Sequence, residues 1–161
     1  MLWHIEIEPF DPHSDHVGER LATEAEELGL AGPWTIRASR GFLVEGDVST
    51  DRLARAASEV LSDPVVETAK LHPIPSPVDG HSAVVHVLPK PGVTDPEAES
   101  AGALLRDLGH AVTEVRTIRT YRIDGPSNRL PRLIERLLAN DAVDQAIVGV
   151  LAIDHLGQGQ P

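Results

Sequence analysis

The sequence runs through the same series of landmarks twice, once on each side of a proline-rich segment. That segment, His72 to Ser82, contains three prolines and a glycine and has no apolar periodicity, so neither a helix nor a central strand is expected there. Leu28-Gly29 in the first half is matched by Leu108-Gly109 at a shift of 80, and Gly46 is matched by Gly125 at a shift of 79. A chain with this organisation is constrained to fold as two similar units joined by a linker.

Both halves have the same predicted order of elements, β-α-β-β-α-β, in which a hairpin joins the second and third strands. The expected strands of the first half are 2–8, 34–39, 40–45 and 65–71, with helices over 14–28 and from about residue 50. The expected strands of the second half are 83–88, 112–118, 119–124 and 142–153, with helices from Thr94 and around 130–138. Residues 52–67 align with 129–144 at a shift of 77, with five identities in 16 positions. We read this agreement as a duplication.

These patterns predict an α+β fold of two ferredoxin-like β-α-β-β-α-β units, at 1–74 and 83–153, with a linker at 75–82 and a flexible tail at 154–161. In each unit, two helices would cover one face of an antiparallel sheet and leave the other face bare. We therefore expect the antiparallel sheets to pack together as a pseudo-dimer. Aromatic residues make up only 3% of the chain, so the core must be aliphatic, and we assign Ile5, Leu61 and Val115 to it.

The charge and composition exclude several classes of protein. Lys and Arg number 14 against 25 Asp and Glu, which gives a net charge of −11 and argues against binding to nucleic acid. No apolar run approaches the ~20 residues that a membrane span needs. The N-terminus lacks the features of a signal peptide, and the chain has no cysteine, so we expect a cytoplasmic protein without disulfides or thiolate metal sites.

Catalytic motifs are absent from the sequence. It contains no glycine-rich phosphate loop, no zinc-protease motif and no nucleophile elbow, so we assign no catalytic residues and no cofactor. Asp11, His13, Asp15 and His16 carry side chains that ligate borderline metals. They lie where a strand should turn into a helix, where aspartate caps the helix and favours its dipole. We prefer the capping interpretation, and a metal site around His13 and His16 is the alternative.

Arginines gather in the second half, where seven of the 14 basic residues lie between 106 and 136. Strand alternation places Arg119 and Tyr121 on one side of a strand, and arginine with tyrosine is typical of interface anchors. Arg37 and Arg40 mark a similar place in the first half. A solvated strand face is the alternative. We predict a partner-binding surface formed by Arg37, Arg40, Arg116, Arg119 and Tyr121.

Short motifs in the second half occur in an order that resembles a known family. They are Pro91-Gly92-Val93-Thr94-Asp95-Pro96, Leu108-Gly109, Val115-Arg116 and Leu137-Leu138-Ala139-Asn140. This part of the chain is similar to the PurS-type small subunit of phosphoribosylformylglycinamidine synthase, a ligase of purine biosynthesis. The family typically continues with Pro-Val-Ile-Glu, which the first half matches better, at 61–67. Ala98 and Asp141 depart from the family's usual glycine and proline, and Arg40 and Arg119 stand where it usually has a lysine.

The resemblance implies a non-catalytic role. Such subunits bring the glutaminase subunit to the synthetase subunit and are thought to help ammonia pass between them, during the ATP- and glutamine-dependent conversion of formylglycinamide ribonucleotide to formylglycinamidine ribonucleotide. One family subunit is about half this length, so the chain resembles a tandem-duplicated, covalent form of the usual dimer. The implied partners are the synthetase and glutaminase subunits, and a homodimer of tandem chains is left open.

Two other classes of function are compatible with the sequence. One is a ligand-sensing module of the ACT type, which shares the β-α-β-β-α-β plan and requires a small-molecule pocket where the units pair. The other is a small metal-dependent enzyme that uses the aspartate and histidine group at 11–16.

Overall fold

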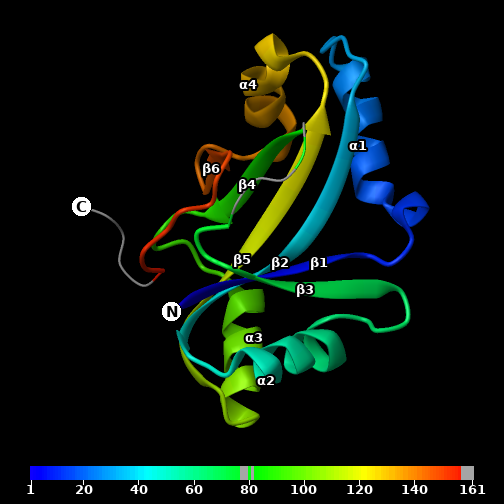
Figure 1. Cartoon of the computed structure of the whole chain (residues 1–161). Coiled ribbons are helices and arrows are strands. Elements are labelled where there is room, and N and C mark those ends of the chain that lie inside the picture. Colours follow the sequence, from blue (N-terminus) through cyan, green and yellow to red (C-terminus); the bar gives the residue numbers. More distant parts are fainter. Residues whose placement is uncertain (77–79, 81, 157–161) are drawn as a thin grey trace.

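The computed structural model describes residues 1–76, 80 and 82–156, and its elements follow the same order in both halves of the chain (Figure 1). The first half contains β1 (Leu2–Pro9), η1 (Pro12–Ser14), α1 (His16–Glu27), β2 (Thr35–Asp47), α2 (Thr50–Ala56), η2 (Ala57–Leu61) and β3 (Glu67–Pro73). The second half contains β4 (Ala83–Pro89), α3 (Pro96–Asp107), β5 (Ala111–Asp124), η3 (Ser127–Arg129), α4 (Leu130–Leu133), η4 (Ile134–Leu138) and β6 (Asp144–Val148).

All six strands form one antiparallel sheet in the order β3-β1-β2-β5-β4-β6. Strands β2 and β5 pair along their whole lengths, from Thr35 opposite Asp124 to Asp47 opposite Ala111. Strand β1 pairs with the C-terminal part of β2, and β4 with the C-terminal part of β5. The α+β class and the antiparallel strand pairing are as predicted from the sequence.

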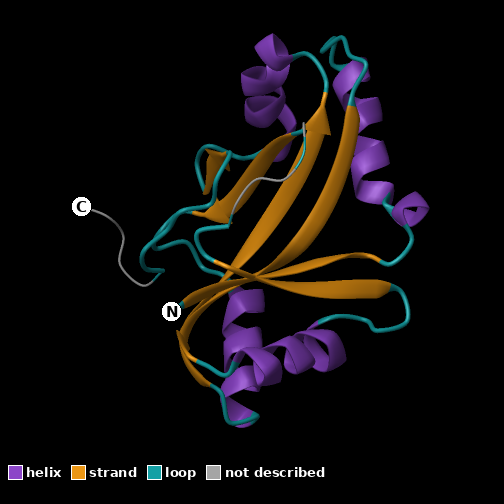
Figure 2. Cartoon of the chain, in the orientation of Figure 1, coloured by secondary structure: helices purple, strands orange, loops and turns teal. Residues whose placement is uncertain are grey.

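Two pairs of helices cover the sheet, one pair at each end (Figures 1 and 2). Helix α1 lies with α4 at one end, and α2 lies with α3 at the other, so each pair takes one helix from each half of the chain. Ile36 of β2 packs under the first pair, and Phe42 and Val44 pack under the second. Because these positions differ by even numbers along one strand, all four helices lie on the same face of the sheet.

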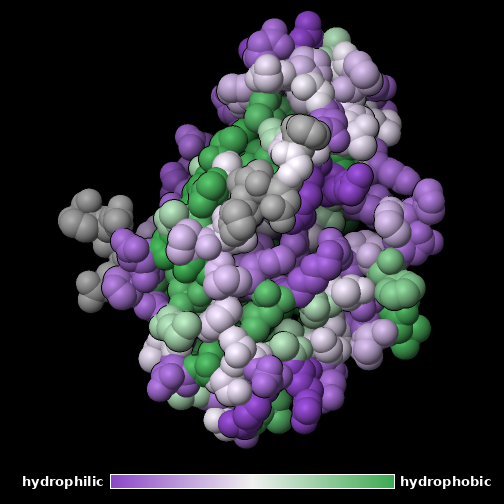
Figure 3. Space-filling view, viewed as in Figure 1, coloured by the Kyte–Doolittle hydropathy of each residue, from purple (hydrophilic) through white to green (hydrophobic). Residues whose placement is uncertain are grey.

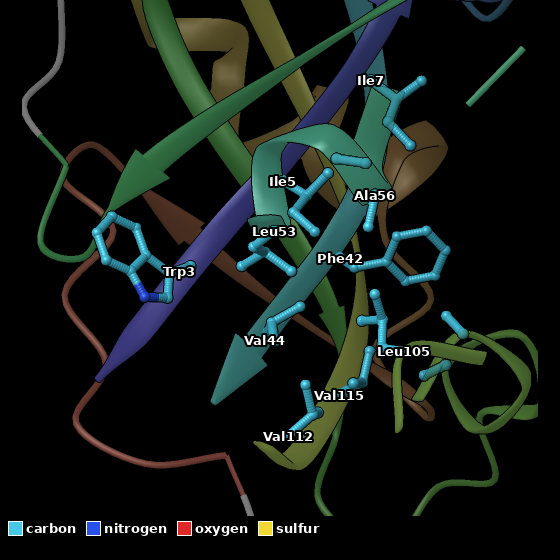
Figure 4. Close-up of a cluster of buried hydrophobic side chains, with 13 residues drawn as sticks. Trp3, Ile5, Ile7, Phe42, Val44, Leu53, Ala56, Leu105, Val112 and Val115 are labelled. Carbon is cyan, nitrogen blue, oxygen red and sulfur yellow. The ribbon is translucent and has the colours of Figure 1, made fainter. Parts of the chain in front are cut away.

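Each helix pair encloses a core built from both halves. In the core of Figure 4, side chains of β1 and the C-terminal part of β2 meet Leu53 of α2, Leu105 of α3 and Val115 of β5. The other core joins α1 to the strands and the last helix of the second half: Leu21, Ala25, Trp34, Ile36, Val85, Val87, Tyr121, Ile123, Leu133 and Leu138. Each end is therefore a ferredoxin-like unit whose first helix and second strand come from the other half of the chain.

The hairpins expected at 34–45 and 112–124 are wrong, since β2 and β5 each run as one continuous strand. Neither Arg40 nor the pair Ile118-Arg119 is a turn former. Gly41 does not form a turn. It allows β1 and β2 to approach closely, because a Cβ there would come 1.8 Å from the carbonyl oxygen of Ile5. Each strand thus continues into the other end of the molecule. The two halves therefore meet edge to edge, through hydrogen bonds between β2 and β5. The expected packing of one sheet face against another is wrong, because all six strands belong to one sheet.

The face opposite the helices is covered in part by the segments that follow β3 and β6. Ser76 and Leu151 form a bridge between these segments, and Leu151 and Leu156 pack with Leu43 and Ile118 of the sheet. The tail expected to be flexible from residue 154 is anchored as far as Leu156, whose backbone N–H donates to Glu45 Oε2 at 2.9 Å. Residues 157–161 of that tail, and 77–79 and 81 of the expected linker, lie outside the described residues.

Candidate functional site

Arg40 and Arg119 lie directly opposite each other at the middle of the β2–β5 pairing. They are related by a shift of 79 in the sequence, the same shift that relates Gly46 to Gly125. Alternation along the strands places both side chains on the helix face, at the seam between the two helix pairs. About half of each side chain is exposed, 44% for Arg40 and 46% for Arg119. Two guanidinium groups thus stand side by side at the centre of the molecule.

An acidic residue at the start of an outer strand holds each guanidinium group. Arg40 Nη2 donates to Glu67 Oε1 at 2.8 Å, and Arg119 Nη2 donates to Asp144 Oδ2 at 3.0 Å. Because these ion pairs are exposed, they add little to stability, typically below about 1 kcal/mol each. Their effect is to fix the direction of two long side chains.

A cavity of about 360 Å³ lies beside the two arginines. Both arginines and Asp144 line it together with the loop from Val93 to Asp95. The loop is held by Asp95, whose Oδ2 accepts hydrogen bonds from the backbone N–H and the hydroxyl of Thr117 at 2.8 and 3.0 Å. The cavity is therefore bounded by a fixed loop on one side and two fixed cations on the other.

The other predicted partner-binding residues do not join this surface. Arg37 is exposed, but it alternates with Arg40 and so faces the opposite side of the sheet. Arg116 is mostly buried, and its Nη1 donates to the carbonyl oxygen of Val93 at 3.4 Å. Tyr121 is only 4% exposed, which corrects its assignment as a surface anchor. Its hydroxyl lies 3.4 Å from Arg119 Nη1 and so helps to position that arginine.

A buried ionic cluster on the opposite face was missed in the sequence. Glu6 of β1 is 1% exposed and accepts two hydrogen bonds from Arg122 of β5, at 2.6 and 3.1 Å. Ser39 Oγ donates to Glu6 Oε2 at 2.6 Å, and His72 Nε2 lies 3.2 Å from Glu6 Oε1. Burial acts to raise the pKa of Glu6, but hydrogen bonds from His72, Arg122 and Ser39 outweigh it and hold the pKa well below its usual range.

Two further histidines lie beside this cluster. The ring centroids of His4 and His86 are 6.0 Å apart, and His86 Nδ1 lies 3.0 Å from Thr120 Oγ1. Burial is the main cause that lowers the pKa of both histidines to about 4, so both are neutral at neutral pH. One signal in the sequence could have indicated this cluster. In β1, the polar residues His4 and Glu6 alternate with apolar residues that face the core.

The aspartates at 11–16 act as caps. Asp11 Oδ1 accepts from the backbone N–H of His13 at 2.9 Å, and Asp15 accepts from the N–H groups of Gly18 and Ala38 at 2.9 and 2.8 Å. Within the described part of the chain, no group of three or more histidine, aspartate or glutamate side chains is arranged to hold a metal ion. Both carboxylates are thus engaged by backbone N–H groups.

The fold and the seam define an α+β protein of two interlocked ferredoxin-like units with a charged cavity between them. Residues 82–151 match the family model PurS, described as phosphoribosylformylglycinamidine (FGAM) synthase. This match covers the second half of the chain and supports, for that half, the resemblance to the PurS family that the sequence motifs predicted. No curated protein matches the chain. None of the described helices has the length and apolar character needed to cross a membrane.

Proposed function

We propose that this chain is a non-catalytic subunit of FGAM synthase that couples the glutaminase subunit to the synthetase subunit and assists ammonia transfer between them. The observation that carries the proposal is the pair Arg40 and Arg119 beside the loop Val93 to Asp95, which lies in the family-matched half. The chain would act in the ATP- and glutamine-dependent conversion of formylglycinamide ribonucleotide to formylglycinamidine ribonucleotide.

The chain is, in this proposal, a tandem duplication with repeats at 1–74 and 83–153 joined by 75–82. Strand pairing supports it, since Ile7 lies opposite Arg40, and their counterparts in the second half, Val87 and Arg119, also lie opposite each other. These counterparts are related by the shifts of 80 and 79 found in the sequence. The caps also correspond, because Asp95, the counterpart of Asp15, accepts from Ala98 N–H as Asp15 does from Gly18 N–H. One chain would thus replace a dimer of single-repeat subunits.

The arginine pair suits a partner that presents an acidic group. Two like charges placed directly opposite on a sheet are destabilising, so the site gains when an anion enters between them. Glu67 and Asp144 each occupy one edge of a guanidinium group, and a guanidinium has five N–H donors. The remaining donors, beside a cavity, are available to a carboxylate of the synthetase or glutaminase subunit. Arg37 and Arg116 lie on the other face and would serve a second contact.

An assembly experiment tests this proposal. The tagged chain is mixed with purified synthetase and glutaminase subunits, and the complex is followed by size-exclusion chromatography. The double substitution Arg40→Ala with Arg119→Ala should weaken assembly by about ten- to a hundredfold, as expected for interface anchors. Arg20→Ala, at an arginine of α1 whose side chain is 65% exposed and to which no partner contact is assigned, is the control. Undiminished assembly by the folded double variant would contradict the role of the pair.

The cavity also favours a second candidate function, the amino-acid sensing of an ACT-like module. A cavity of about 360 Å³ has room for a free amino acid, and its lining offers guanidinium groups for the carboxylate and Glu97 for the ammonium group. A rise in the melting temperature on adding a particular amino acid, lost in Arg119→Ala, would support this alternative. No shift with any of the common amino acids would exclude it.

A further inference from the structure

Three large apolar side chains are exposed together where β1 ends and β3 begins. Phe10, Val65 and Val66, which we call the first-end patch, are 76%, 83% and 56% exposed. Figure 3 shows hydrophobic surface at the right-hand edge of the molecule, where Figure 1 places the end of β1 and the start of β3. Exposed apolar side chains that gather in this way mark interaction surfaces.

The backbone beneath the first-end patch is held by a set of hydrogen bonds. Phe10 N–H donates to the carbonyl oxygen of Val66 at 2.8 Å, and Glu67 N–H donates to that of Asp63 at 2.7 Å. Val65 N–H donates to Asp63 Oδ1 at 3.0 Å. The patch is thus presented on a fixed frame, which lowers the entropy lost when a partner binds.

The second half builds the same frame with different side chains. Lys90 N–H donates to the carbonyl oxygen of Val143 at 2.8 Å, and Asp144 N–H donates to that of Asn140 at 2.7 Å. Ala142 N–H donates to Asn140 Oδ1 at 3.1 Å. Lys90 stands in the place of Phe10 and Ala142 in the place of Val65. Val143 stands in the place of Val66 and is itself 41% exposed. The frame therefore forms without Phe10 and Val65, and folding does not explain the exposure of these two side chains in the first half.

Acidic residues flank the first-end patch. Asp11 follows Phe10 in the chain and Asp63 caps the turn, and both are exposed. Neither carboxylate forms an ion pair with a side chain in the described part of the chain. The chain as a whole carries a net charge of −11. A complementary surface is an apolar recess flanked by lysine or arginine.

We propose that the first-end patch docks one other subunit of FGAM synthase through an apolar recess with a basic rim, and that the second end does not bind that subunit. This inference rests on the proposed function for the identity of the partner. A dimer of identical single-repeat subunits would present two equal ends, whereas this chain presents two ends of different chemistry on one frame. The two ends of the chain would thus bind different partners.

Binding of the full-length chain to the purified synthetase subunit, to the purified glutaminase subunit and to both together, measured by biolayer interferometry, tests the inference. Phe10→Ser with Val65→Ser removes the first-end patch at exposed positions. Lys90→Ser with Ala142→Ser is the matched control at the second end. The first-end variant should raise Kd for one of the two subunits about ten- to a hundredfold and leave the other unchanged. The control should leave the affinity of that same subunit unchanged.

A second variant tests the acidic rim. Asp11→Asn with Asp63→Asn should slow association with that same subunit and reduce the dependence of the association rate on salt. Wild-type affinity of the first-end variant for both subunits would overturn the inference while leaving the proposed function standing. So would an equal loss in the control, or self-association of the wild-type chain that the first-end variant abolishes. A wild-type chain that binds neither subunit, separately or together, would overturn the proposed function as well.

Discussion

Glu6 and Arg122 form a two-bond ion pair, at 2.6 and 3.1 Å, although they are 116 residues apart in the chain. Glu6 belongs to the first half and Arg122 to the second, so the pair ties the halves together on the face opposite the helices. The Glu6 side chain is only 2% exposed, and a buried carboxylate of this kind depends on its partner.

Arg122→Ala should therefore destabilise the protein by about 2–4 kcal/mol, because it leaves the Glu6 carboxylate buried with fewer donors. The Arg122 side chain is 36% exposed, so the loss should fall below that of a fully buried pair. Arg37 lies opposite Arg122 in the strand pairing, and Arg37→Ala should change stability by less than about 0.5 kcal/mol. Urea unfolding of both variants gives the comparison. Equal effects would show that the ion pair contributes nothing specific.

Stability should fall as the pH is lowered from about 6.5 to 4. The pKa of His4 and His86 is lowered by burial to about 4, against an ordinary value of 6.5. In this range the unfolded chain binds protons that the folded chain does not, so stability is lost as the pH falls. Each histidine contributes on the order of 3 kcal/mol over the full range. Glu6 acts in the same direction below its unfolded pKa.

Denaturant unfolding between pH 4.5 and 7.5 measures this dependence. His86→Gln removes one titrating group and should flatten the profile in that range. A profile that His86→Gln does not alter would mean that folding does not lower the pKa of His86.

Leu105 of α3 is fully buried in the core of Figure 4, against strands of the other half of the chain. Leu105→Ala should cost about 2–5 kcal/mol, the usual range for a leucine truncated in a core. The adjacent Leu104 is 37% exposed, and Leu104→Ala should cost less than about 1 kcal/mol. Thermal unfolding of the two variants provides the test. A larger loss for Leu104→Ala would mean that the orientation of α3 is wrong.

Because each core needs both halves, neither half should fold as a closed monomer. Residues 1–76 and 82–156 expressed as separate chains should associate when mixed, or pair with themselves by the same strand exchange. Sedimentation velocity and circular dichroism measure mass and folding together. A folded monomer of either half would show that β2 or β5 is able to turn back as a hairpin.

The local signals of the sequence located most elements. Gly29 and Gly109 end α1 and α3 with φ of 79° and 90°, the conformation that made them visible as helix stops. Leu61, expected in the core, is only partly buried, because the second helix changes to π geometry over Ala57–Leu61. The spacing of apolar residues in the sequence does not indicate such a change of helix geometry.

Local sequence signals could not predict that β2 and β5 each continue into the end of the molecule built mainly by the other half of the chain. The alternation of side chains over 34–45 is the same whether the strand turns back or continues, and the outcome depends on β5, far away in the chain. For the same reason the contact between Glu6 and Arg122 had no local signal. The pairing of Arg40 with Arg119 follows once the two strands are placed side by side.

Reconstituted FGAM synthase tests the central claim most directly. Synthesis of formylglycinamidine ribonucleotide is measured with glutamine and, separately, with free ammonia, using complexes that contain the wild-type chain, the Arg40→Ala with Arg119→Ala variant, or no chain. A coupling subunit predicts that the variant loses glutamine-dependent synthesis and largely retains synthesis from ammonia. Full glutamine-dependent synthesis in the absence of the chain would contradict the coupling role.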